Sequence, residues 1–218
     1  MNFNDVVNAL TFLSPIILLI GITIGVKKYK VLDIIHKSIV CYFVVMLCVD
    51  TTGRIIWITT GNNLIVLPIY SLIEILLFLV FYYKCLFRSR HLSIIGLGIA
   101  GILYILWELL QYKSNAKEFQ SYSKVVDNFI VITLVLAFFY EKINKFRESK
   151  WDNFKLNAVI LAYFSINLIF FLPINFLINE TSGLKFYFWL VNLIVTILFY
   201  IYLTTLIGKN IYSQKEKP

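Results

Sequence analysis

The chain has 218 residues, of which 60% are hydrophobic and 15% are charged, and it carries a formal net charge of +8. Soluble domains contain about 25% charged residues, so this composition excludes an ordinary soluble fold. In lipid, only helices and closed barrels satisfy every backbone polar group. The apolar runs here are continuous rather than alternating, and we therefore expect an all-α integral membrane protein.

Seven apolar stretches long enough to cross a bilayer follow one another along the chain. A helix needs about 20 apolar residues to span the hydrocarbon core. The expected spans cover residues 6–26, 38–57, 64–87, 92–110, 124–140, 156–178 and 186–207. The connections between them are short. We therefore expect a bundle of seven transmembrane helices that forms one domain over residues 1–218, without a soluble domain.

The first stretch differs from a cleavable signal peptide. Asn2, Asn4 and Asp5 precede it in place of basic residues, it has no cleavage site of the A-x-A type, and a basic cluster begins at Lys27 directly after it. We expect this stretch to remain in the membrane as the first helix.

The distribution of lysine and arginine predicts the orientation of the bundle. Of the 20 basic residues, 15 fall on the side of the first loop, and the other side holds only Arg54, Lys113, Lys117, Lys124 and Lys185. Short cytoplasmic loops carry such an excess. We therefore expect the N-terminus outside and the C-terminus in the cytoplasm. The richness in Ile, Lys, Phe and Asn favours a bacterial inner membrane as the location.

Topology and anionic lipid headgroups account for the positive net charge, so we expect the lipid bilayer and not a nucleic acid as the partner. The only two histidines, His36 and His91, lie at expected cytoplasmic boundaries, and the three cysteines show no metal-ligand spacing. We expect no metal and no cofactor. No catalytic motif is present, and we name no catalytic residue.

Polar residues within the spans carry the functional signal, because a charged group in a membrane helix is costly and usually faces a bundle interior or a cavity. Glu74 is the strongest case. It lies ten residues after Leu64, which places it about 15 Å along the third helix and near the midplane. Its neighbours at i−4 and i+4 are Tyr70 and Phe78, so no basic residue shares its helix face.

The second span contains Asp50 with Arg54 at i+4. This spacing puts both side chains on one helix face, where they can form an ion pair. A self-neutralising pair near the interface and a functional pair are both open interpretations.

The remaining candidates lie at the expected outer ends of later spans. Glu108 is near the end of the fourth helix, and Asp127 begins the fifth with Lys124 at i−3. Asn192 lies in the seventh helix and Asn175 in the sixth. An acidic residue in a first turn is favoured by the helix dipole alone, and buried asparagine often serves only as interhelical glue.

By the expected topology Glu74 lies at mid-depth, beneath polar residues of the outer half, which are Asp50, Arg54, Glu108, Asp127, Asn175 and Asn192. Glu74, Asp50, Arg54, Glu108, Asp127 and Asn192 would surround a polar cavity that opens to the outer side and ends at Glu74. We take them as a candidate ligand or proton site. Pro173 is expected to kink the outer third of the sixth helix by leaving a carbonyl without its donor.

Three functions fit this pattern. The first is a sensory or small-ligand binding module that signals through a cytoplasmic protein docked on the basic segment from Lys142 to Lys155. The second is a small proton-coupled transporter that uses Glu74. The third and least favoured is an intramembrane enzyme on a lipid-linked substrate. The sequence slightly favours binding over transport.

Overall fold

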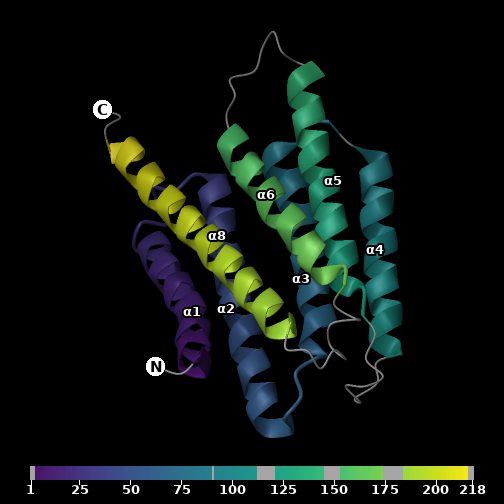
Figure 1. Cartoon of the computed structure of the whole chain (residues 1–218). Coiled ribbons are helices and arrows are strands. Elements are labelled where there is room, and N and C mark those ends of the chain that lie inside the picture. Colours follow the sequence, from purple (N-terminus) through teal and green to yellow (C-terminus); the bar gives the residue numbers. More distant parts are fainter. Residues whose placement is uncertain (1–2, 90, 112–120, 145–152, 174–183, 216–218) are drawn as a thin grey trace. The chain divides into compact units, whose positions relative to one another are not determined.

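The computed structural model describes residues 3–89, 91–111, 121–144, 153–173 and 184–215 (Figure 1). Within these ranges the chain forms helices and turns and no strand. Seven of the helices are long and apolar enough to cross a membrane. The expected all-α membrane fold with seven spans is confirmed.

The helix bounds follow the apolar runs closely. The helices are α1 (Phe3–Lys27), α2 (Ile34–Thr60), α3 (Val66–Phe81), α4 (Leu92–Leu110), α5 (Ser123–Asn144), α6 (Phe154–Phe171) and α8 (Leu184–Lys215). A π-helical turn, η1 (Tyr82–Leu86), continues α3 to the end of the third span.

The sixth span differs from its expected length. It was expected over residues 156–178 with a kink at Pro173, but α6 ends at Phe171, two residues before this proline. Proline commonly follows the end of a helix because it cannot continue the backbone hydrogen bonds. Pro173 therefore follows the end of α6 rather than bending it, and the expected kink is wrong. Residues 174–178, with Asn175, lie outside the described ranges.

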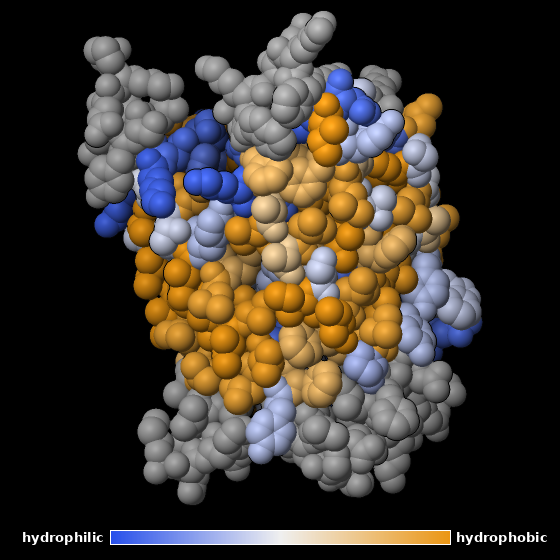
Figure 2. Space-filling view, turned by 45° about the horizontal axis from the view of Figure 1, so that its top comes forward, coloured by the Kyte–Doolittle hydropathy of each residue, from blue (hydrophilic) through white to orange (hydrophobic). Residues whose placement is uncertain are grey.

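The helices expose large apolar side chains. Leu110 is 87% exposed, Ile58 80% and Leu92 75%. Hydrophobic residues also make up most of the described surface visible in Figure 2. Monomeric soluble proteins rarely expose extensive apolar patches, whereas lipid tails contact such surfaces without cost. The protein is an integral membrane protein whose exposed apolar side chains face the bilayer.

The helices gather into two compact units. The terminal unit comprises Met1–Gly61 and Lys185–Pro218, and thus α1, α2 and α8. The middle unit is Asn62–Leu184, with α3 to α6. A single domain over the whole chain stays a prediction.

In the terminal unit, two glycines let α1 and α2 approach closely. A Cβ atom on Gly21 would lie 2.3 Å from the Phe43 ring, and one on Gly25 would lie 2.3 Å from Val40 Cγ2. Small residues four apart permit this approach between membrane helices. Phe43 of α2 also contacts α8, where the Tyr200 ring centroid lies 5.9 Å from that of Phe43.

Asp33 determines where α2 begins. Its carboxylate accepts hydrogen bonds from the His36 amide at 2.9 Å and from the His36 ring at 2.6 Å, as an N-cap residue does. Asn210 of α8 donates to its other oxygen at 3.1 Å. Burial opposes ionisation of this carboxyl, but the hydrogen bonds from His36 outweigh it and lower the pKa of Asp33.

In the middle unit, α5 is the central helix, because it packs against α3, α4 and α6. Half of the residues in the apolar part of the membrane span of α5 are buried, the largest share among the seven spans. Gly101 of α4 lies against Ile130 of α5, where a Cβ would come within 2.2 Å of Ile130 Cδ1. Phe78 of α3 meets Phe164 of α6 edge to face at 4.9 Å.

The close approach at Gly25 gives a stability prediction. We expect Gly25→Ala to lower the free energy of unfolding by about 1–3 kcal/mol, because its methyl group overpacks the stiff Val40 side chain. Gly96→Ala is the matched control. Apart from the backbone of its own helix, no atom of the described residues lies within 4 Å of its Cβ position, and removing a helical glycine stabilises by about 0.5–1 kcal/mol. Unfolding in detergent followed by circular dichroism measures both, and equal midpoints for the two variants would contradict this packing.

Candidate functional site

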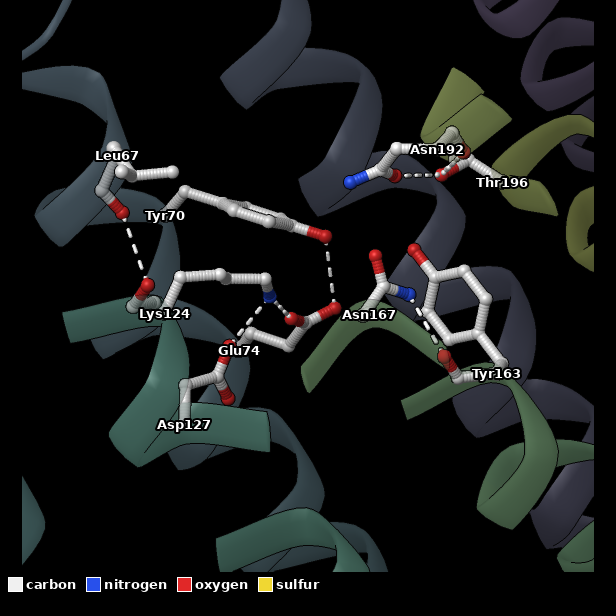
Figure 3. A network of polar contacts seen from close by, with 10 residues as sticks. Leu67, Tyr70, Glu74, Lys124, Asp127, Tyr163, Asn167, Asn192 and Thr196 are labelled. Atoms are coloured by element: carbon white, nitrogen blue, oxygen red, sulfur yellow. Dashed lines mark hydrogen bonds and ion pairs between the residues drawn. The ribbon is translucent and has the colours of Figure 1, made fainter. Parts of the chain in front are cut away.

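A charged cluster lies inside the middle unit, where α3 meets α5. Lys124 of α5 donates from Nζ to Oδ2 of Asp127, one turn further along, at 2.5 Å, and to Oε2 of Glu74 on α3 (Figure 3). The two carboxylates are fully buried and the Lys124 side chain is 4% exposed. We call Glu74, Lys124 and Asp127 the charged triad.

Tyr70 completes the surroundings of the ammonium group. Its hydroxyl donates to Glu74 Oε1 at 2.9 Å, and its ring centroid lies 4.1 Å from Lys124 Nζ. In Figure 3 the Tyr70 and Lys124 side chains extend alongside one another toward Glu74. Phe164 of α6 lies 5.7 Å from the same nitrogen. Two carboxylates and aromatic rings therefore replace the water that Lys124 would have at the surface.

Helix geometry explains how the triad assembles. Tyr70 and Glu74 are four residues apart on α3, and Lys124 and Asp127 are three apart on α5, so each pair shares a helix face. Glu74 is about 12 Å along α3 from Val66 at 1.5 Å per residue. Lys124 is the second residue of α5. Because lysine has a long side chain, it can reach a carboxylate well inside the neighbouring helix.

Some buried polar atoms next to the triad have no hydrogen-bond partner among the described residues. They are Asp127 Oδ1, Ser123 Oγ and both side-chain polar atoms of Asn128. All three residues are 0% exposed. Buried polar groups are almost always bonded, so each exception calls for an explanation.

Asp50 and Arg54 form the expected ion pair. Arg54 Nε donates to Asp50 Oδ2 at 2.7 Å, and Nη2 donates to the carbonyl of Thr11 on α1 at 2.7 Å. The guanidinium also lies 5.1 Å from the Phe12 ring. The pair is balanced in charge, belongs to the terminal unit and joins α2 to α1, as a structural bridge does.

Two other predicted residues make local contacts. Glu108 Oε2 accepts from the backbone amide of Tyr122 at 3.2 Å, and its Oε1 has no partner within the described residues. Asn192 accepts from Thr196 on its own helix at 3.3 Å. Of the six expected site residues, only Glu74 and Asp127 bind one common group.

Sequence analysis missed the residue that joins them. Lys124 was expected at the outer start of the fifth span, three residues before Asp127, whereas it also binds Glu74 across helices. One signal was present. Ser123, Lys124, Asp127 and Asn128 put four polar residues into the first six of an otherwise apolar helix, more than a lipid-facing turn would tolerate.

Comparisons with protein-family models, with curated proteins and with solved structures each find no match for this chain. The functional reading therefore depends on the geometry of the triad and its neighbours.

The buried triad gives a second stability prediction. We expect Lys124→Met to lower the free energy of unfolding by about 3–5 kcal/mol, because it leaves two buried carboxylates without their cation. Arg54→Met is the matched control. Its Asp50 partner is 30% exposed, so we expect a loss of about 1 kcal/mol or less.

A compensated variant tests whether charge or packing causes this loss. The triple variant Glu74→Gln/Lys124→Met/Asp127→Asn removes all three charges, and we expect it to recover much of the stability that Lys124→Met loses. Unfolding in detergent measures all of these variants. If the triple variant were as unstable as Lys124→Met, the charge explanation would be wrong.

Proposed function

We propose that the protein is a small proton-coupled transporter, with the charged triad as its proton-binding site. The observation that carries this proposal is the imbalance of charge in a fully buried place. Two carboxylates, Glu74 and Asp127, bind one ammonium group, Lys124. With all three ionised, the site has a net charge of −1.

An uncompensated buried charge costs several kcal/mol. One proton on either carboxylate removes this charge while Lys124 stays paired with the other. The triad can therefore exist in a proton-loaded neutral state and in a proton-free state that needs another positive charge. A transporter that couples a solute to protons requires such a pair of states.

The position of the triad between two helices supplies a mechanism for coupling. Glu74 belongs to α3, whereas Lys124 and Asp127 belong to α5. A proton on Glu74 weakens the attraction between α3 and Lys124, and a proton on Asp127 leaves that attraction across the helices intact. Proton binding would therefore change how firmly α3 is held against α5.

A layer of apolar residues follows the triad along both helices. On α3 it consists of Ile75 and Phe78, and on α5 of Val131, Leu134 and Val135, all of them buried. Such a layer would stop protons from leaking past the site. With the expected orientation, N-terminus outside and C-terminus cytoplasmic, the site is closer to the outer surface of a bacterial inner membrane.

The sensory or binding module that the sequence favoured slightly is less well supported by this geometry. It relied on a shared cavity of six residues and on a cytoplasmic partner at Lys142 to Lys155, of which residues 145–152 lie outside the described ranges. The argument from the charge imbalance of the triad requires neither that cavity nor a cytoplasmic partner. The enzyme hypothesis needs carboxylates available to a substrate, whereas both triad carboxylates bind Lys124.

Infrared difference spectroscopy can detect the proton directly. Between acidic and alkaline pH we expect the wild-type protein in lipid to lose the carbonyl band of a protonated carboxyl group. This band should disappear in Glu74→Gln or in Asp127→Asn. Glu108→Gln is the matched control and should keep the band, because Glu108 does not contact the triad. A spectrum unaltered by both triad variants would reject the proton site.

Transport is measured in proteoliposomes that contain a pH-sensitive dye. We expect some member of a panel of amino acids, sugars and organic cations to evoke a proton flux in the wild type. Glu74→Gln should abolish that flux while the protein keeps its helical circular-dichroism spectrum. A proton flux that continues unchanged in Glu74→Gln would exclude a coupling role for this residue.

A further inference from the structure

The polar atoms without partners beside the triad suggest what the transported solute is. Ser123 Oγ, Asp127 Oδ1 and Asn128 Oδ1 are buried oxygens without a hydrogen-bond partner in the described part of the chain. They lie within the first six residues of α5. Ser123 and Asp127 are four residues apart and share a helix face, and Asn128 directly follows Asp127.

A proton alone does not satisfy this group. On Asp127 Oδ1 it would neutralise the charge, but Asn128 Oδ1 and Ser123 Oγ would still be unpaired. Leaving such a buried group unpaired costs about 1–3 kcal/mol. A ligand that supplies positive charge to several oxygens at once would satisfy the group better than a proton.

The chemistry of the unpartnered oxygens and the net charge of the triad restrict the kind of ligand. Carboxylate, amide and hydroxyl oxygens are ligands for hard cations. The net charge of −1 on the proton-free triad is balanced by one positive charge and not by two. An anion is disfavoured, because the Lys124 ammonium is already occupied by Glu74, Asp127 and the face of Tyr70.

We propose that Ser123, Asp127 and Asn128 bind a small monovalent cation, which the protein exchanges for the proton of the triad. This inference rests on the proposed function and names its substrate class. The exchange balances: one cation enters the site as one proton leaves a triad carboxylate, and the buried site stays neutral in both states. An alkali-metal ion and a small organic cation share the required chemistry.

The test uses the full chain in proteoliposomes with an acidic lumen and a pH-sensitive dye inside. Sodium, potassium or guanidinium chloride is added outside in separate arms, and choline chloride is the baseline because choline is bulky. We expect at least one of the three small cations to make the lumen more alkaline in the wild type. The arm that responds distinguishes a metal ion from an organic cation. No response above choline in any arm would overturn the inference.

Asn128→Leu tests the site itself. Leucine has a similar size and removes only atoms without partners, so we expect the variant to fold and to keep the infrared band of the triad proton. Its apparent affinity for the responding cation should fall about tenfold or more, as expected when a ligand to a charged group is lost.

Asn167→Leu is the matched control. Asn167 is also buried, but its amide donates to the carbonyl of Tyr163 on its own helix at 2.9 Å. We expect this variant to retain the cation affinity of the wild type. Full affinity in Asn128→Leu, or an equal loss in both variants, would reject the assigned site. Absence of a pH-dependent carbonyl band in the wild type would instead reject the proton site on which the inference rests.

Discussion

The middle unit depends on the pairing of one buried ammonium group with two carboxylates. In a membrane protein, charges away from water must be compensated by other groups of the protein, because lipid supplies neither counter-ions nor hydrogen bonds. Lys124 meets this condition through Glu74 on α3 and Asp127 on α5. The same contact holds these two helices together at the point where α5, the central helix of the unit, begins.

Apolar packing determines where that contact can form. Gly101 lets α4 lie against Ile130 of α5, and the edge-to-face contact of Phe78 with Phe164 brings α3 and α6 together. These contacts require a close fit of shapes, so they set the rotation of each helix. The rotation in turn decides whether Glu74 faces Lys124 or lipid. Packing and charge are therefore coupled: the helices place the triad, and the triad opposes any rotation that would separate its members.

The sequence predicts the spans well, because the cost of burying polar backbone and side chains in lipid makes each apolar run nearly continuous. It also predicts the pair of Asp50 and Arg54, since a spacing of four residues determines that contact within one helix. Glu74 was singled out by its depth alone. Its partner Lys124 was not identified, because it is 50 residues away in the sequence. Contacts between helices depend on how each helix is rotated, and hydrophobic periodicity cannot determine this rotation in so apolar a chain. The end of α6 before Pro173 was missed for a similar reason, as hydropathy alone does not show where a helix stops.

The pair of Asp50 and Arg54 and the charged triad differ in their balance of charge. Arg54 and Asp50 are one cation and one anion, and together they are neutral whatever the protein does. Asp127, three residues further along the same helix, would by itself balance the charge of Lys124. The second carboxylate, Glu74, adds a negative charge that the fold must neutralise, so it is unfavourable for a purely structural bridge. In the proposed transporter, the missing positive charge at this carboxylate comes and goes. The imbalance, rather than the burial, is therefore what supports an exchange site in the middle unit.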